Sequence, residues 1–343
     1  MSYTSKAKGS AGALVPVTRS PIATVDTSRA DEYARASRSD RTWRQYASAW
    51  KQFEAWCSDQ GHSPFPASTP LLRNYVAWLA DQGRTVATIN AYLAAIATRH
   101  SGAGHAIDRE ALRNDIKGIR RKKPRKTRQV SPLVATDLRA LMTGFGDDTS
   151  AARDRLLFAL GFAGALRRSE LVGLDWKEAG TGDGYVAMDE RGLVITLLRS
   201  KSGRGEPVEI IVPCPDMPTA CDALGRWAVI ASLKPGDPVF REVIKGGEIG
   251  AQRLTDRSVA RIIKRRVRQR ALALGHPESE ADELAEAFSG LSLRSGYCTA
   301  AAMAGVPEWK IRRRSRHRTA EMVARYVRAA EEWTDSGLKG IGF

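Results

Sequence analysis

Residues 289–326 contain several residue types that could do chemistry on an anion. Arg294 comes first, His317 follows in a basic turn, and Tyr326 stands nine positions after the histidine. Thr319 can cap a helix that carries the tyrosine, because apolar residues recur after it at helical spacing. A tyrosine hydroxyl would then lie near an arginine and a histidine, so the stretch could bind a phosphate and attack it. In the alternative, Arg294 forms a surface ion pair and Tyr326 is a core residue.

The charge of the chain indicates that the anion belongs to nucleic acid. The 343 residues include 54 Lys and Arg against 38 Asp and Glu, which gives a formal charge of +16 and a pI near 10.0. This excess suits a polyanionic partner, and neither a long apolar run nor a signal peptide favours a membrane. A merely soluble basic protein is the alternative.

Neither the cysteines nor the acids have the spacing of a metal site. Cys57, Cys214, Cys221 and Cys298 are scattered along the chain, which favours a reducing cytoplasm and no zinc site. The sequence also has no Walker loop and no cluster of Asp and Glu at metal-ligand spacing. A metal-dependent nuclease therefore has little support, and we expect no metal and no cofactor.

Helical patterns predict a compact N-terminal domain. Aromatic residues within 39–61 lie on one face of a helix, and we expect them in the core and not in contact with bases. Three further helices follow, so that residues 38–120 are expected to form an all-helical domain that binds DNA. Residues 1–37 are rich in Ser, Ala, Gly and Thr, and we expect a disordered tail.

A densely basic linker, residues 121–131, separates this domain from the next. Pro124 interrupts it, and it has no apolar face. Two interpretations stay open: a flexible linker, or a linker that lies along a phosphate backbone and releases counterions as it binds.

Residues 132–330 are expected to mix helices with a small antiparallel sheet. Alternating, β-branched segments predict strands near 185–188, 193–198 and 208–212, and the last two are joined by a hairpin loop that carries Lys201. The chain then returns to helices, one of which follows Thr255. Its apolar side is narrow and the rest is almost uniformly positive, which fits the major groove of DNA. An ordinary solvated face is the alternative.

Five residues match, in type and order, the active site of a known enzyme family. They are Arg167 in GALRRSEL, Lys201 on the hairpin, Arg294 in GLSLRSG, His317 in SRHRT and Tyr326 in VARYVR. In the type and order of these five residues, the chain resembles the tyrosine recombinases, which exchange DNA strands at specific sites. The segments SDRTWRQYASAWKQFEAWC, FPASTP and TVATINAYL are similar to the core-binding domain of the Cre-like members. The resemblance covers residue 38 to the end and implies a mainly α, two-domain fold that closes on DNA as a C-shaped clamp.

The resemblance implies how the phosphate is held. Arg167 and Arg294 would clamp its oxygens, since a guanidinium can donate to two of them at once. Glu170, one helical turn after Arg167, would support the arginines, and His317 would hydrogen-bond the phosphate.

The resemblance also implies the covalent chemistry. Tyr326 would be the nucleophile and would form a 3′-phosphotyrosine, while Lys201 would act as general acid to the leaving 5′-hydroxyl. Rejoining is the same chemistry in reverse, so no ATP is needed. Four protomers would exchange strands through a Holliday junction, with residues 331–343 docking on a neighbour.

Further residues are implied to contact DNA, namely Arg44, Thr88, Asn90, Arg121, Lys122, Lys123, Arg199, Arg257, Ser258 and Arg261. The implied partner is double-stranded DNA with inverted-repeat half-sites, together with accessory proteins whose identity the sequence does not specify. The expected location is the cytoplasm, at the nucleoid.

One position departs from the family pattern. The family carries His-x-x-Arg at its second arginine, whereas this chain has Leu291 three residues before Arg294. A leucine can neither hydrogen-bond a phosphate nor carry a proton. Three hypotheses follow: a weakened but active recombinase, a non-catalytic DNA-binding relative, and a type IB topoisomerase, which the Cre-like N-terminal domain disfavours.

Overall fold

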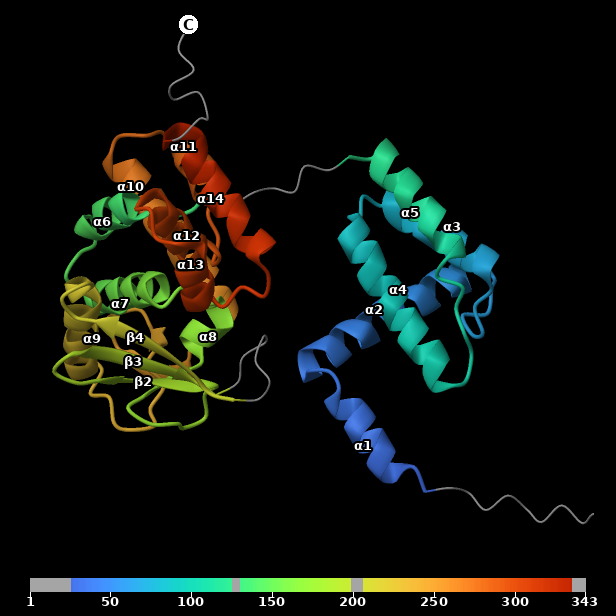
Figure 1. Cartoon of the computed structure of the whole chain (residues 1–343), viewed down its shortest axis with the longest axis horizontal. Helices are drawn as coiled ribbons and strands as arrows, with labels where there is room; N and C mark the ends of the chain where they lie inside the picture. The colour runs from blue at the N-terminus through green and yellow to red at the C-terminus, as the bar shows by residue number, and fades with distance from the viewer. Residues whose placement is uncertain (1–25, 125–129, 199–205, 335–343) are drawn as a thin grey trace, which may run out of the picture. The chain divides into compact units, whose positions relative to one another are not determined.

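The chain folds as two units, residues 1–127 and 128–343 (Figure 1). The computed structural model describes residues 26–124, 130–198 and 206–334, and from 328 onward the backbone alone. Within these ranges none of the helices combines the length and the apolar character needed to cross a membrane.

The N-terminal unit is entirely helical in its described part. Ser39, Ser68 and Thr85 each accept a hydrogen bond from the backbone N–H three residues later and so begin three of its helices. The helices are α1 (Ser28–Ala36), α2 (Asp40–Asp59), α3 (Thr69–Asp81), α4 (Val86–Gly102) and α5 (Ala111–Lys122).

Aromatic side chains form the core of this unit. Trp50, Phe53 and Trp56 of α2 are buried, and the rings of Phe53 and Trp56 lie 4.9 Å and 5.0 Å from that of Tyr75 in α3. The prediction that the aromatic stripe is core is therefore confirmed. The prediction of a disordered tail over residues 1–37 is corrected for residues 28–36, which form α1, and the Arg35 carbonyl accepts a hydrogen bond from the indole of Trp43. Residues 1–25 lie outside the described residues.

The C-terminal unit mixes nine helices and six strands within its described residues. The helices are α6 (Ala135–Thr143), α7 (Thr149–Ala163), α8 (Arg168–Val172), α9 (Pro218–Ile230), α10 (Asp256–Ala273), α11 (Glu278–Glu286), α12 (Ser292–Met303), α13 (Glu308–Ser315) and α14 (Ala320–Thr334). The strands are β1 (Leu174–Trp176), β2 (Gly184–Met188), β3 (Gly192–Leu197), β4 (Val208–Pro213), β5 (Arg241–Val243) and β6 (Ile249–Arg253).

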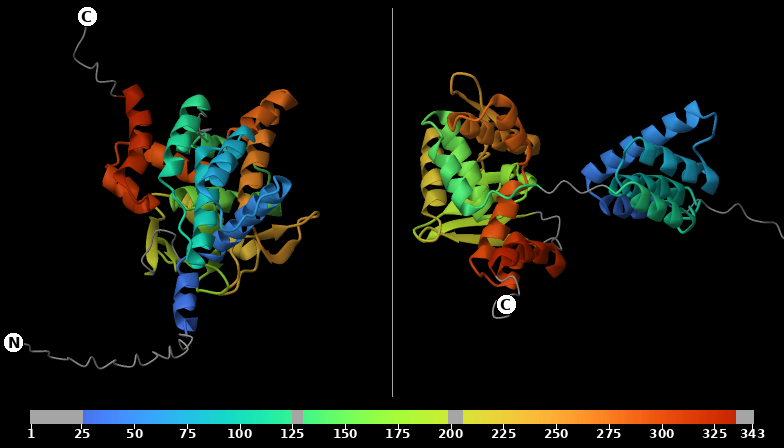
Figure 2. Two further views of the ribbon diagram at one scale, coloured as in Figure 1. Left: turned by 90° about the vertical axis from the view of Figure 1, so that its right-hand side faces the viewer. Right: turned by 90° about the horizontal axis from the view of Figure 1, so that it is seen from above.

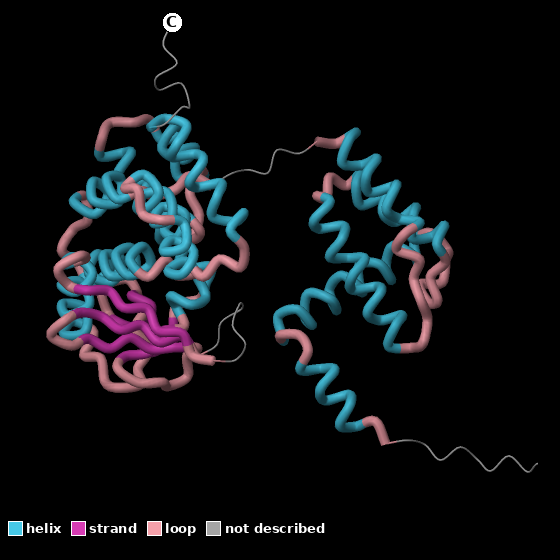
Figure 3. Tube along the Cα trace, in the orientation of Figure 1, coloured by secondary structure: helices cyan, strands magenta, loops and turns pink. Residues whose placement is uncertain are grey.

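The strands of this unit, magenta in Figure 3, include a sheet in the order β1-β2-β3-β4 that is mixed in direction. Strands β2, β3 and β4 pair antiparallel, with Val186 opposite Ile195 and Ile195 opposite Ile210. These are the three strands predicted from alternation. The small antiparallel sheet expected from the sequence is confirmed, and β1, which was not predicted, joins its edge in parallel with β2. Strands β5 and β6, also not predicted, form a separate hairpin.

Helix α7 lies at the centre of the unit. Twelve of its fifteen residues are buried, so it is enclosed on every side, as expected of a helix without a polar face. It packs against α9 and against α12, and Gly161 allows the close approach to α12, because an added Cβ would stand 2.7 Å from a methyl of Leu293. The C-terminal helices α12–α14, red in Figure 2, gather at one edge of the unit.

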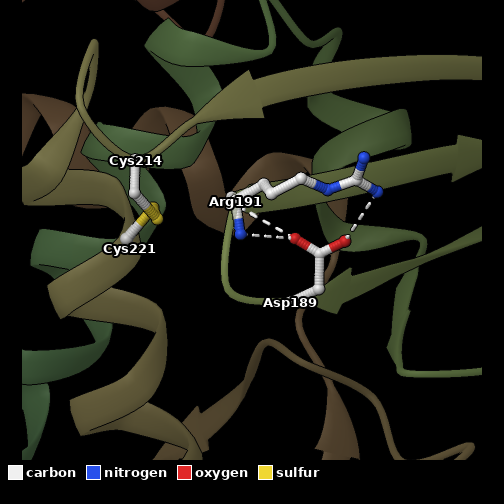
Figure 4. Close-up of a disulfide and its surroundings, with 5 residues drawn as sticks. Asp189, Arg191, Cys214 and Cys221 are labelled. Carbon is white, nitrogen blue, oxygen red and sulfur yellow. Dashed lines mark hydrogen bonds and ion pairs between the residues drawn. A yellow bond between two sulfur atoms is a disulfide. The ribbon is translucent and has the colours of Figure 1, made fainter.

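A disulfide joins the end of β4 to the start of α9 (Figure 4). Cys214 and Cys221 have Cα atoms 5.8 Å apart, and the backbone N–H of Cys214 donates to the carbonyl of Arg191. The scattered spacing of the cysteines does not predict this pair. The other two cysteines, Cys57 and Cys298, are free and buried.

Candidate active site

The first arginine of the site precedes the short helix α8. Arg167 occupies its N-cap position in an extended conformation. Glu170, three residues on, turns back to accept hydrogen bonds from the backbone N–H of Arg167, at 2.8 Å, and from its guanidinium. These two hydrogen bonds, both donated by Arg167 to the carboxylate three residues later, fix the arginine before the helix begins.

A second partner of Glu170 is Arg316, a residue that was not predicted from the sequence. Its Nη2 donates to Glu170 Oε2 at 2.7 Å and to the carbonyl of Ala165 at 3.2 Å. Its Nη1 donates to the carbonyls of Gly164 and Arg314. Arg316 ends α13 with φ of 55°, a left-handed conformation that costs a non-glycine residue free energy. The buried hydrogen bonds hold it there.

Arg294, on α12, completes the group of guanidinium ions. It is 2% exposed, and its Nη1 donates to the same Ala165 carbonyl at 2.9 Å. Burial, together with repulsion from Arg167 and Arg316, lowers the pKa of Arg294 to about 10. The residue therefore remains charged at neutral pH, next to two other guanidinium ions.

One carboxylate faces these three cations. Burial alone would raise the pKa of Glu170, but the charge of Arg316 and the hydrogen bonds and charge of Arg167 hold it below the ordinary value. Glu170 is therefore ionised and compensates one of three positive charges. The group therefore carries a net positive charge, which favours binding of a phosphate.

The histidine follows directly after this cluster. His317 is half-buried in the turn after α13, and its Nδ1 lies 2.7 Å from the hydroxyl of Ser315. Burial, and then the charges of Arg294 and Arg167, lower the pKa of His317 to about 4. The imidazole is therefore neutral at physiological pH.

The tyrosine comes from α14. Tyr326 is 9% exposed, and its ring packs in an apolar cluster with Cys298 and Val323. The ring centroids of Tyr326 and His317 are 6.0 Å apart. The structure thus brings Arg167, Arg294, His317 and Tyr326 together from four separate elements.

Leu291 lies at the N-cap of α12 and is 44% exposed. Its neighbour Ser292 is fully buried, and its hydroxyl accepts from the backbone N–H of Ser289. The Ser292 hydroxyl is therefore occupied by a hydrogen bond within its own turn. Lys201 and Arg199 lie outside the described residues.

The comparisons with known proteins decide the family. Residues 132–332 match the phage integrase family. The chain belongs to the phage integrase family, the tyrosine recombinases. It is 32% identical over 313 residues to an integrase/recombinase xerD homolog of Selenomonas ruminantium, covering 88% of this chain and 85% of that protein. It is also 23% identical to the recombinase cre of Escherichia phage P1, over 88% of each chain.

Solved structures show the same fold. A XerH site-specific recombinase bound to palindromic difH substrate superposes with a TM-score of 0.60 at 15% identity, over 87% of this chain and 79% of that one. The Tn1549 transposon integrase in complex with transposon right end DNA gives a TM-score of 0.60 at 14% identity, over 90% and 98%. The two-domain tyrosine recombinase fold expected from the sequence is confirmed.

In this tyrosine recombinase the expected DNA contacts differ in their surroundings. Arg44, Asn90, Arg121, Lys122, Arg257 and Arg261 are exposed. Lys123 is exposed but pairs with Asp81. The hydroxyls of Thr88 and Ser258 are engaged in helix caps, with Thr85 and Thr255 as their partners. Ser258 is moreover 6% exposed, which leaves it little surface to offer.

The basic helix α10 is less positive than its sequence suggests. Lys264 pairs with Glu286 and Arg268 with Asp282, both acids of α11. Arg265 pairs with Asp154 of α7. The prediction of an almost uniformly positive face is therefore corrected, because acids of α7 and α11 pair with Lys264, Arg265 and Arg268. Arg257 and Arg261, at the beginning of the helix, are exposed.

No group of three or more His, Cys, Asp or Glu that could hold a metal ion occurs among the residues that the structure describes. The side chains that converge in the site are cations, a neutral imidazole and a phenol. Such a set binds an anion directly.

Proposed function

We propose that this tyrosine recombinase cleaves and rejoins DNA with Tyr326 as the nucleophile, through a 3′-phosphotyrosine. The observation that carries the proposal is the convergence of Arg167, Arg294, His317 and Tyr326 from positions up to 159 residues apart in the sequence. A tyrosine that only packs in the core does not require an excess of guanidinium ions over carboxylates. Phosphoryl transfer requires such an excess, because negative charge develops on the phosphate oxygens.

Each group has a task in this reaction. The guanidinium ions of Arg167 and Arg294 neutralise charge on the non-bridging oxygens as the phenol oxygen attacks. Lys201, on the loop between β3 and β4, is proposed to protonate the leaving 5′-oxygen. The phosphotyrosine conserves the energy of the phosphodiester, so rejoining needs no nucleotide.

The proposed assembly follows from the family. Four protomers would bind two sites with inverted half-sites and exchange strands through a Holliday junction at the nucleoid. Each protomer would close on DNA as a clamp, with Arg257 and Arg261 in the major groove, and residues 331–343 would dock on the neighbour. The structures of XerH and the Tn1549 integrase on DNA support the choice of partner.

A second candidate function is a non-catalytic DNA-binding factor. Leu291 favours it, because an exposed leucine replaces a proton-carrying side chain beside the arginines. A type IB topoisomerase would share the chemistry but would relax supercoiled DNA that lacks a specific site.

A nicked suicide substrate distinguishes the catalytic functions from the non-catalytic one. Inverted repeats that flank the encoding gene supply the DNA, once binding to them is shown by gel shift. We expect the wild type to form a covalent protein–DNA band and Tyr326→Phe to bind DNA without forming it. Tyr297→Phe is the matched control, since that tyrosine packs against Phe162 of α7 and should keep the adduct. A wild type that binds and never forms the adduct would establish the non-catalytic function.

A further inference from the structure

Ser315, the last residue of α13, holds the imidazole of His317 by a contact that fixes its protonation. Ser315 is fully buried. Its Oγ lies 2.7 Å from the carbonyl oxygen of Ile311 and 2.7 Å from Nδ1 of His317. Both contacts have the length of good hydrogen bonds.

The two contacts determine where the protons are. A carbonyl oxygen can only accept, so the single hydroxyl proton of Ser315 must point to Ile311. If that proton pointed to the histidine, two bare oxygens would face each other at 2.7 Å. The serine oxygen must therefore accept from His317, which means that Nδ1 carries a hydrogen. In a neutral imidazole the other nitrogen, Nε2, then has a free lone pair.

We propose that Ser315 is a positioning residue that keeps His317 in the Nδ1–H tautomer, so that Nε2 accepts the proton of Tyr326 when the phenol attacks DNA. The proton transfer rests on the proposed function, whereas the tautomer does not. His317 thereby takes the role of base in a chain where Leu291 replaces the usual histidine.

The step balances in atoms and charge. The hydroxyl proton of Tyr326 moves to Nε2 of His317 as the phenol oxygen forms its bond to phosphorus. The bond from phosphorus to the 5′-oxygen breaks, and that oxygen takes a proton from the general acid proposed at Lys201. In rejoining, the 5′-hydroxyl gives its proton back to the group proposed at Lys201 as its oxygen attacks phosphorus. The bond from phosphorus to the Tyr326 oxygen breaks, and the protonated imidazole returns its proton to the tyrosine.

The surroundings of His317 suit this task. The charges that face it are those of Arg294 on α12, Arg167 before α8, Arg325 on α14 and its neighbour Arg316. Together with burial they keep the pKa of the imidazole low, so the ring is neutral before DNA binds, and the same charges weaken it as a base. A bound phosphate offsets these charges and stabilises the cation that forms.

The proposal changes the role expected for His317. A neutral ring with its only hydrogen on Nδ1 cannot donate to a phosphate oxygen through Nε2. After accepting the tyrosine proton it can, so the hydrogen bond to phosphate is made in the transition state and not before it. Such an interaction lowers the barrier without stabilising the bound substrate.

Nuclear magnetic resonance of the full chain tests the tautomer directly. With 15N-labelled histidine, long-range nitrogen–proton spectra at pH 7 should show His317 protonated at Nδ1, with Ser315→Ala giving a mixture of tautomers. Ser295→Ala is the matched control, because Ser295 is buried and its hydroxyl makes the same helical contact, to the carbonyl of Leu291, without an imidazole. Protonation at Nε2 in the wild type would overturn the proposal.

Single-turnover cleavage of the suicide substrate tests the consequence. Ser315→Ala should slow formation of the adduct about tenfold, the effect of losing one hydrogen bond in the transition state, with DNA affinity unchanged. An unchanged rate in a protein whose tautomer has shifted would refute His317 as the base. An Nδ1–H signal in a wild type that forms no adduct would uphold the tautomer and refute the proposed function together with the proton transfer.

Discussion

Removing the charge of Glu170 should destabilise the C-terminal unit far more than removing the charge of a surface acid. Glu170 is 7% exposed and binds Arg167 and Arg316, whose side chains are 27% and 6% exposed. In Glu170→Gln the two guanidinium ions lose their only carboxylate in the described structure and remain in place. Loss of one partner of a buried ion pair costs about 3–5 kcal/mol, and the amide recovers part of this by accepting hydrogen bonds. We expect a loss of about 3 kcal/mol.

A double-mutant cycle separates the ion pair from its surroundings. Arg316→Gln alone should cost about 2 kcal/mol, and the double variant should cost little more than Glu170→Gln, so that the coupling is about 2 kcal/mol. The control cycle combines Arg268→Gln and Asp282→Asn, a pair whose side chains are 37% and 60% exposed. Its coupling should stay below about 0.5 kcal/mol.

Hydrogen exchange of the α7 amides is the appropriate assay, because it measures the stability of this unit without the other. The pH dependence has a defined sign. Since the folded pKa of Glu170 lies below the ordinary value of 4.5, the difference between wild type and Glu170→Gln should be constant above that pH and shrink as pH falls below it. A coupling of less than about 0.5 kcal/mol between Glu170 and Arg316 would refute the reasoning.

Three further predictions concern the site, the DNA surface and the packing. Leu291→His should raise or preserve the rate of adduct formation and leave DNA binding nearly unchanged, because the side chain is 44% exposed; loss of cleavage would mean that the site is built around the leucine. Arg257→Ala should cost about 1–3 kcal/mol of DNA affinity and relax preference at one base, whereas Arg268→Ala should change affinity less in the same titration. Gly296→Ala should destabilise by about 2 kcal/mol or more in thermal unfolding, because the added Cβ would stand 1.9 Å from a backbone carbonyl. Gly118→Ala, which meets nothing within 4 Å, should stabilise helix α5 by about 0.5–1 kcal/mol; equal effects of the two glycine substitutions would contradict this account.

The parts of the fold that follow from the sequence are those with a local cause. Helices α2 and α4 begin at a capping side chain, and strands β2–β4 alternate, so short-range pattern suffices. Helix α1 has no buried residue and therefore no apolar period to detect. Strands β1 and β5 have three residues each, too few for alternation to be visible. The disulfide depends on how β4 leads into α9, which spacing alone does not reveal.

The candidate site divides in the same way. Arg167, Arg294, His317 and Tyr326 could be named because the resemblance orders them along the chain. Arg316 could not, because it lies in the run RRRSRH, where nothing in the sequence distinguishes a buried arginine from its exposed neighbours. Its left-handed backbone and its contact with Glu170 arise only when α8 and α13 meet.

The acidic partners of the α10 cations could not be identified from the sequence either. Asp282 and Glu286 lie in an acidic stretch that is typical of a protein surface, and Asp154 lies in a segment that predicts an apolar helix. Each meets its basic partner across 14 to 112 residues of sequence. A charge pattern read along one helix therefore overestimates the charge that the folded surface presents.

Helix α7 has a consequence for how a cut would be placed along DNA. Asp154, in its first half, is fully buried and holds both Arg265 and Arg266 of α10. The other end of α7 leads, within four residues, to Arg167. In the proposed complex, the helix that contacts the bases and the arginine that binds the phosphate would thus both be held by α7, at points about 14 Å apart along its axis. This fixed spacing would set the number of base pairs between the DNA sequence that is recognised and the phosphodiester bond that is broken.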